Sequence, residues 1–283
     1  MVNISLSPHI DRLIDLALEE DIGAGDVTTQ ALIPADLQGE AHIRAKEKLV
    51  VAGLPVATRV FAKLDPEVQF APQAQDGQEV EPGTVLAHIT GPVAPILTGE
   101  RVALNFLQHL SGIATLTKKM VEAVAFLPVA LVDTRKTTPG WRVLEKYAVR
   151  LGGGRNHRGG LFDGVLIKNN HLTATGSITE AVRRARKNVP HTLKIEVEVT
   201  SLAELEEALG IGADIIMLDN MSDADLAKAA DLTLGRALLE ASGSMTLERL
   251  PQVAATRVNF ISVGALTHSA PAVDIHLRLI KTW

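Results

Sequence analysis

Three segments in the middle of the chain concentrate basic side chains. They are Asp133–Gly140, Gly152–Arg158 and Ile167–His171. Positions 133–171 carry eight Lys or Arg against three Asp or Glu, although the whole chain has a net charge of -5. Arginine fits the planar shape of a carboxylate or phosphate, and lysine supplies a compact positive charge. The segments therefore favour a small polyanionic ligand over the alternative of a solvated basic surface, and we interpret His157 as a carboxylate ligand rather than a proton shuttle.

Acidic side chains follow on two later strands. Glu196 and Glu198 lie two residues apart and point the same way, and Asp219 ends a strand further along the chain. Carboxylates that converge in a basic pocket suit Mg²⁺, which prefers oxygen ligands and is often held through substrate phosphates. The alternative is that these acids pair with Lys136 or Lys168, and the sequence leaves both open.

Small residues indicate where a phosphate would bind. Ser242–Gly243 and Gly264 end the last two predicted strands, where α/β barrels commonly build a phosphate site, and His268 follows closely enough to donate there. The run Gly152–Gly154 either offers backbone donors to an anion or simply caps the preceding helix.

From residue 129 onward, a short apolar run followed by a helical segment recurs six times. The runs are Val129–Val132, Gly164–Ile167, Leu193–Val199, Asp214–Leu218, Ala237–Leu239 and Phe260–Val263. Strands that alternate with helices pair in parallel through right-handed crossovers. We favour a closed barrel over an open doubly wound sheet, because polar residues follow every run and a barrel places its active site at those ends. An eight-stranded barrel would need two further strands.

The N-terminal part shows a different pattern. Ser7–Glu20 predicts a helix with Ser7 as its N-cap and a proline in its first turn. Residues 41–51, 68–74 and 84–90 predict antiparallel strands, and residues 98–124 predict a helix. This half is therefore expected to be α+β.

Composition excludes several classes of protein. With 46% apolar residues, a chain of 283 can bury a barrel and a smaller domain, and without cysteine it forms neither disulfides nor thiolate metal sites. The N-terminus does not read as a signal peptide, and the longest apolar run, residues 123–132, is too short for a membrane helix. Scattered charges and 3% aromatic content give no nucleic-acid surface. We expect a cytoplasmic protein with no membrane or nucleic-acid partner.

The motifs resemble those of quinolinate phosphoribosyltransferase along nearly the whole chain. The resemblance rests on Glu20–Gly23, Gly25–Thr29, Glu100–Arg101, Leu104–Asn105, Asp133–Thr137, Pro139–Gly140, Lys146–Val149, Gly152–Gly154, Asn156–Arg158, Leu166–Lys168, Glu196–Val199, Leu218–Asn220, Ser242–Gly243 and Gly264–Ser269. It implies phosphoribosyl transfer from phosphoribosyl pyrophosphate to quinolinate, with release of carbon dioxide and pyrophosphate, giving nicotinate mononucleotide in NAD biosynthesis. The alternative is a relative with the same scaffold that acts on another pyridine or in metal storage.

The resemblance also implies an architecture. The expected fold is α/β, with an incomplete, six-stranded parallel α/β barrel and an N-terminal α+β domain that has an open-faced sheet. The expected domains are residues 1–112, completed by the tail 270–283, and residues 113–269. The resemblance implies a homodimer, or a higher oligomer of dimers, whose subunits share each active site.

The resemblance assigns a role to each candidate residue. Those expected to hold the two carboxylates of quinolinate are Arg135, His157, Arg158 and Lys168, with Arg101 from the neighbouring subunit. Those expected to contact phosphoribosyl pyrophosphate are Lys136, Glu198 and Asp219, the two acids through Mg²⁺ or the ribose hydroxyls. Those expected to hold the 5-phosphate are Ser242, Gly243, Gly264 and His268. Thr134 is expected in the substrate pocket, and the expected catalytic residues are Lys136, Lys168, Glu198 and Asp219.

Two other functions fit single features of the sequence. A Schiff-base aldolase would use Lys136 or Lys168 at the end of a barrel strand, and borohydride trapping would reveal it. A carrier module would use the double turn at residues 76–83, but that turn contains no lysine to modify.

Overall fold

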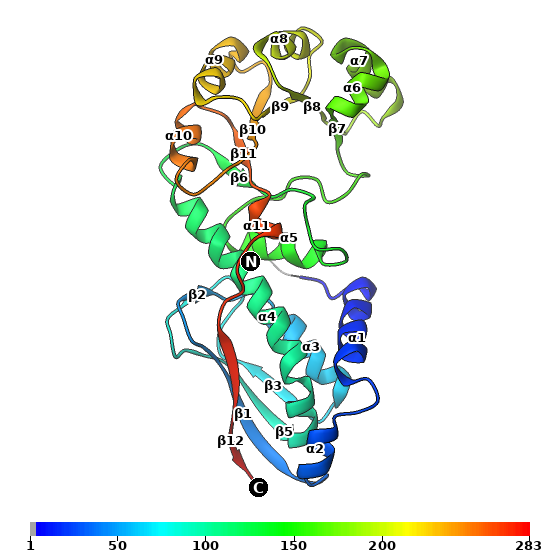
Figure 1. Ribbon diagram of the computed structural model, residues 1–283, viewed down its shortest axis with the longest axis vertical. Helices are drawn as coiled ribbons and strands as arrows, with labels where there is room; N and C mark the ends of the chain where they lie inside the picture. The colour runs from blue at the N-terminus through cyan, green and yellow to red at the C-terminus, as the bar shows by residue number, and fades with distance from the viewer. Residues whose placement is uncertain (1–3) are drawn as a thin grey trace. The chain divides into compact units, whose positions relative to one another are not determined.

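The computed structural model describes residues 4–283, which form two compact units (Figure 1). Unit 1 contains the chain up to Lys118, the segment Thr138–Gly153 and the tail Ala270–Trp283. Unit 2 contains Lys119–Thr137 and Gly154–Ser269. Each unit has a sheet and a hydrophobic core of its own.

Unit 1 is built on a four-stranded antiparallel sheet in the order β12-β1-β5-β3. Its strands are β1 (Gln38–Ala45), β3 (Gln69–Pro72), β5 (Val85–Pro92) and β12 (Ile275–Thr282), and a separate pair is formed by β2 (Leu49–Val50) and β4 (Glu79–Val80). Alternate residues of β1 are buried, from Gly39 to Ala45. Because side chains alternate along a strand, one face of this sheet packs on the core and the other carries polar side chains.

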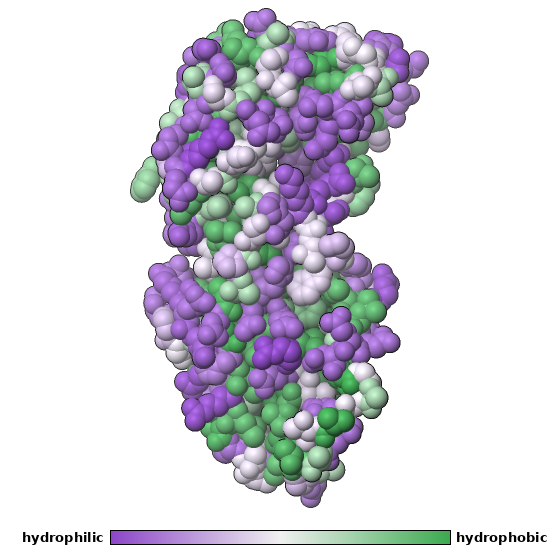
Figure 2. Space-filling view, viewed as in Figure 1, coloured by the Kyte–Doolittle hydropathy of each residue, from purple (hydrophilic) through white to green (hydrophobic). Residues whose placement is uncertain are grey.

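The described part of unit 1 contains the two helices predicted for this half of the chain, as α1 (Pro8–Ile22) and most of α4 (Val93–Glu122). Its other helices are α2 (Val27–Leu32) and α3 (Leu54–Leu64), which the sequence analysis does not predict, and α5 (Arg142–Leu151). Helix α4 is the longest, yet no helix within residues 4–283 is long and apolar enough to cross a membrane. Figure 2 shows mainly hydrophilic side chains on the visible face, with hydrophobic ones gathered over the sheet and α4 of unit 1.

Residues 138–153 lie in unit 1. They fall inside the second predicted domain, residues 113–269, so the structure and the predicted domains differ for this segment. The ring of Trp141 stacks on Phe106 of α4, with ring centroids 4.6 Å apart. The fully buried carboxylate of Glu145 lies 2.9 Å from Nε2 of His109, also on α4. These contacts attach α5 to unit 1 although its sequence lies between two strands of unit 2.

The glycine run Gly152–Gly154 ends helix α5. Gly152 is the C-cap and donates its N–H to the carbonyl of Ala148. A Cβ at Gly152 would lie 2.4 Å from the carbonyl oxygen of Ala114, so only glycine allows α5 to pack this closely on α4. The helix-capping interpretation of these glycines is the one that the structure supports.

Unit 2 contains six parallel strands in the order β6-β11-β10-β9-β8-β7. They are β6 (Ala130–Val132), β7 (Val165–Ile167), β8 (Ile195–Val199), β9 (Ile215–Asp219), β10 (Leu238–Ser242) and β11 (Phe260–Ser262). The helices are α6 (Asn169–Thr175), α7 (Ile178–Asn188), α8 (Leu202–Gly210), α9 (Asp223–Thr233), α10 (Leu250–Ala255) and α11 (Ala265–His268). In Figure 1 the helices α6 to α10 follow the outer side of the curved sheet.

The sheet of unit 2 does not close. Strands β6 and β7 are its two edges, and no ladder joins them in the described part of the chain. Part of the segment between them enters unit 1 as α5, and the rest contributes only an isolated parallel bridge from Arg155 to Val132, so no strand bridges the gap. The closed barrel favoured by periodicity is therefore wrong, and the incomplete six-stranded barrel implied by the resemblance is confirmed.

Candidate active site

A cavity of about 570 Å³ lies at the carboxyl ends of the strands in unit 2. Because parallel strands end at the same rim, polar residues far apart in sequence meet there. Ten of the residues predicted from the sequence line it: Thr134, Arg135, Lys136, His157, Arg158, Lys168, Glu198, Asp219, Ser242 and Gly243.

Two more predicted residues lie beside this cavity. A Cβ at Gly264 would lie 3.0 Å from Cδ of Lys136 and 3.2 Å from Nε2 of His268. The hydroxyl of Thr267 donates to the carbonyl of Lys136 at 2.7 Å, so the turn after β11 fixes the loop that carries the lysine. Arg101 is not among the residues that line this cavity. It is an exposed residue of α4 in unit 1.

Glu198 and Lys168 pair with each other at the rim. Nζ of Lys168 lies 3.4 Å from Oε2 of Glu198, whose side chain is mostly buried while the lysine is half exposed. Glu198 therefore makes the ion pair with Lys168 that the sequence offers as one of its two alternatives. On the next strand, Asp219 accepts a hydrogen bond from the side-chain amide of Asn220 at 2.9 Å and faces the same cavity.

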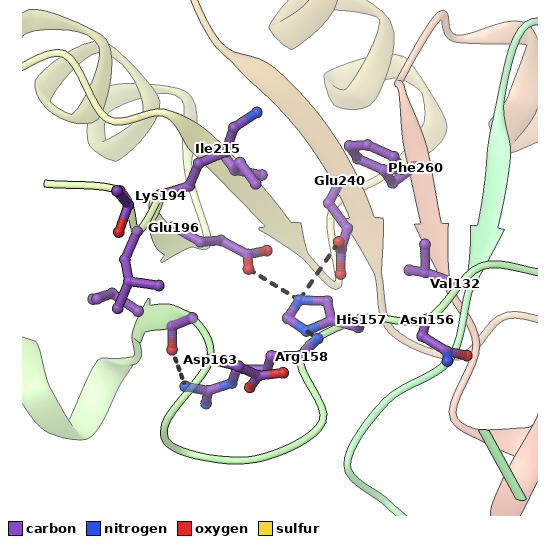
Figure 3. A pocket seen from close by; sticks show the side chains of 14 residues that line it. Val132, Asn156, His157, Arg158, Asp163, Lys194, Glu196, Ile215, Glu240 and Phe260 are labelled. Atoms are coloured by element: carbon purple, nitrogen blue, oxygen red, sulfur yellow. Dashed lines mark hydrogen bonds and ion pairs between the residues drawn. The ribbon is translucent and has the colours of Figure 1, made fainter. Parts of the chain in front are cut away.

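A second group of charges lies deeper in unit 2 (Figure 3). Nε2 of His157 lies 2.9 Å from Oε2 of Glu196 and 3.8 Å from Oε2 of Glu240. The exposed fractions of the two acids are only 4% and 3%. A further cavity, of about 340 Å³, is lined by the same three side chains and by Arg158.

Burial changes the ionisation of these groups. Desolvation, followed by the charge of Glu196, raises the pKa of Glu240 to about 7. Desolvation, followed by the nearby Arg135, lowers the pKa of Arg158, whose guanidinium nevertheless stays charged at neutral pH. Arg158 therefore keeps its positive charge, whereas burial beside Glu196 favours the protonated form of Glu240.

Some lining residues were not assigned a role from the sequence. They are Asn220, Glu240, Ser244 and Ser262. The sequence groups Glu196 with Glu198 and Asp219 as carboxylates suited to Mg²⁺, but Glu196 does not line this cavity and instead contacts His157. The available signal was a glutamate inside an otherwise apolar strand, as in Leu238–Ser242, because charged side chains are rarely buried without a partner.

Comparison with known proteins gives the same family along almost the whole chain. Residues 26–111 match the family model "Quinolinate phosphoribosyl transferase, N-terminal domain", and residues 113–278 match the model of the C-terminal domain. The chain belongs to the quinolinate phosphoribosyltransferase family.

Curated relatives extend this match. A probable nicotinate-nucleotide pyrophosphorylase [carboxylating] of Synechocystis is 48% identical over 275 residues, covering 96% of this chain and 93% of the relative. A protein of the same name from Bacillus subtilis is 46% identical and covers 95% and 93%. Quinolinate phosphoribosyltransferase [decarboxylating] 1b of Nicotiana tabacum is 43% identical and covers 94% and 81%.

Solved structures agree with the fold. NadC from Streptococcus pyogenes superposes with a TM-score of 0.93 at 43% identity, covering 99% of this chain and 100% of that one. The nicotinate-nucleotide pyrophosphorylase of Francisella tularensis gives a TM-score of 0.94 at 40% identity, covering 99% and 98%.

The loops after β9 and β10 meet at the predicted phosphate site, each with a residue of positive φ. Gly243 has a φ of +100° and Asn220 a φ of 54°. A Cβ at position 243 would lie 2.1 Å from Oδ1 of Asn220. Arg249 donates to the carbonyls of Gly243 and Met221 at 3.2 Å each, which ties the two loops together.

We expect Gly243→Ala to weaken the binding of phosphoribosyl pyrophosphate by at least about tenfold, because the new Cβ strains the backbone and displaces Asn220. Isothermal titration would measure this change. Gly235→Ala is the matched control, since Gly235 also has a positive φ, of +75°, but a Cβ there meets no atom within 4 Å. Unchanged affinity in Gly243→Ala would contradict the assignment of this loop to the phosphate.

Proposed function

We propose that the chain converts quinolinate and phosphoribosyl pyrophosphate into nicotinate mononucleotide, pyrophosphate and carbon dioxide in NAD biosynthesis. The observation that carries the proposal is one cavity in which four cationic side chains meet two carboxylates from the carboxyl ends of neighbouring strands. These residues are Arg135, Lys136, Arg158, Lys168, Glu198 and Asp219. The names of the curated relatives describe the same reaction.

The cations suit a pyridine that carries two carboxylates. Arg135, Arg158 and Lys168 supply charge and forked donors for these groups, and His157 lines the cavity beside them. The ion pair between Lys168 and Glu198 keeps the lysine at the rim before substrate arrives. A carboxylate of quinolinate would then compete with Glu198 for that lysine.

The opposite end of the cavity suits phosphoribose. The backbone carbonyl of Lys136 accepts a hydrogen bond from Thr267, and the lysine side chain would neutralise the pyrophosphate. Ser242 and Gly243, beside Gly264 and His268, would hold the 5-phosphate on short turns after β10 and β11. Thr134 accepts a hydrogen bond from the N–H of Lys136 at 3.0 Å and so shapes this loop.

We propose Mg²⁺ as the cofactor. Glu198 and Asp219 offer carboxylate oxygens from neighbouring strands to one cavity, which is the donor chemistry that Mg²⁺ prefers. The two acids would contact phosphoribosyl pyrophosphate through the ion or through its ribose hydroxyls. When bound, the ion would neutralise charge on the pyrophosphate.

The proposed chemistry depends on positioning and charge neutralisation. The bond from ribose C1 to pyrophosphate breaks as the pyridine nitrogen attacks C1, so an oxocarbenium-like centre develops and pyrophosphate takes the electron pair. The resulting pyridinium accepts the electrons of the bond to the 2-carboxylate, carbon dioxide leaves, and the ring carbon takes a proton. The basic residues must therefore hold that carboxylate without overstabilising it.

We also propose a homodimer, alone or within a larger assembly, in which Arg101 completes the site of the other subunit. Arg101 is exposed on α4, and hydrophobic side chains lie over α4 and the sheet of unit 1 (Figure 2). A second copy would cover these side chains. A cytoplasmic location suits a chain without cysteine.

The test incubates the purified protein with quinolinate, phosphoribosyl pyrophosphate and Mg²⁺, and follows nicotinate mononucleotide and carbon dioxide. Nicotinate serves as a parallel substrate, and EDTA removes the metal. We expect product from quinolinate only, and none with EDTA. Absence of turnover with quinolinate would overturn the proposed reaction, and full activity in EDTA would overturn the role of Mg²⁺.

Single substitutions separate the two ends of the cavity. Lys136→Ala should weaken binding of phosphoribosyl pyrophosphate, and Arg158→Ala should weaken binding of quinolinate, each by about tenfold or more because a charged partner is lost. Isothermal titration of each variant with both ligands provides its own control. If both variants bind both ligands with the affinity of the wild-type protein, these assignments are wrong.

The shared site can be tested by combining two defects. Homodimers of Arg101→Ala and of Lys168→Ala should both be inactive, whereas a purified heterodimer of the two has one site with both residues intact. We expect that heterodimer to regain about half of the wild-type activity, because one of its two sites is complete. An inactive heterodimer would show that Arg101 serves its own subunit.

A further inference from the structure

The dipeptide His157–Arg158 is held at three points. The N–H of His157 donates to Oδ1 of Asp133 at 2.8 Å, and the N–H of Arg158 donates to Nδ1 of His157 at 2.7 Å. Nε2 of the same ring lies 2.9 Å from Oε2 of Glu196. The backbone that carries Arg158 therefore depends on the orientation of the histidine ring.

These contacts define the tautomer of His157. Nδ1 accepts a hydrogen bond from a backbone N–H, so it carries no proton, and the proton of the neutral ring lies on Nε2. Nε2–H then donates to Glu196 (Figure 3). This orientation of the ring requires a hydrogen-bond acceptor at position 196.

A metal ion would need the opposite tautomer. Ligand atoms of His157, Glu196 and Glu240 lie within 4.8 Å of one another, a separation that a metal could bridge. Coordination through Nε2 would move the ring proton to Nδ1, where it would face the N–H of Arg158 across 2.7 Å. The ring as placed therefore serves as a hydrogen-bonded support.

Glu196 and Glu240 both lie close to Nε2 of His157. They are buried, and their Oε1 atoms have no hydrogen-bond partner among the described residues. Glu240, on β10, lies 3.8 Å from the same Nε2 of His157 (Figure 3). Burying two carboxyl groups is costly, and the group they both face is the ring of His157.

We propose that Glu196 and Glu240 are positioning residues for the dicarboxylate substrate. Glu196 fixes the ring of His157 by its hydrogen bond, and Glu240 lies close to the same nitrogen. The ring fixes the backbone of Arg158, and Arg158 meets a carboxylate of the pyridine. The guanidinium of Arg158 also donates to the carbonyl of Gly164 at 3.0 Å, which limits its reach once its backbone is fixed. This inference rests on the function proposed above.

The test compares Glu196→Gln with Glu196→Met. Gln keeps an oxygen that accepts from Nε2–H, whereas Met has a similar length and no such acceptor. In Glu196→Gln we expect the KM for quinolinate to stay within about threefold of the wild-type value. In Glu196→Met it should rise about tenfold or more, because the buried Nε2–H of His157 then lacks its acceptor. The KM for phosphoribosyl pyrophosphate should not change in either variant.

A double-mutant cycle separates positioning from loss of stability. In an Arg158→Ala background, Glu196→Met should add little to the KM for quinolinate, because its effect passes through Arg158. Additive effects, or equal increases of both KM values, would overturn the proposal, and thermal denaturation of each variant shows which of them fold. Turnover of quinolinate by the wild-type protein is measured in the same experiment. If the wild-type protein does not turn over quinolinate, the proposed reaction is wrong rather than the positioning role.

Discussion

Parallel pairing of six strands is the constraint on which the site depends. Each strand of unit 2 runs in the same direction, so residues that follow separate strands reach one rim whatever their distance in sequence. Lys168, Glu198, Asp219 and Ser242 arrive there from four neighbouring strands. The sheet itself sets the spacing between these four groups.

The rim residues could be predicted because they are marked locally. A polar residue at the end of an apolar run shows both the strand and its end, as at Ile167–Lys168 and Leu218–Asp219. The open edge of the sheet could not be predicted in this way. It depends on residues 138–153 leaving for unit 1, through contacts such as Trp141 on Phe106 that join distant parts of the chain.

The glycines show the same division between local and distant causes. The glycine run after α5 is equally suited to an anion or to a helix end when only the sequence is known. The structure decides for the helix end, because the backbone of α4 lies where a side chain at Gly152 would be. Gly243 is needed for a similar reason, but there the crowding side chain is Asn220, at the rim of the cavity.

Depth in the sheet gives two glutamates of one strand different chemistry. Glu196 and Glu198 are two residues apart and share a face, and in the sequence they look equivalent. Glu198 lies nearer the carboxyl end, where it meets a half-exposed lysine and the cavity. Glu196 lies deeper, where its partner is a neutral imidazole and its charge raises the pKa of Glu240. The acid at the rim can therefore exchange partners with a ligand, whereas the deep one can only hold the wall in shape.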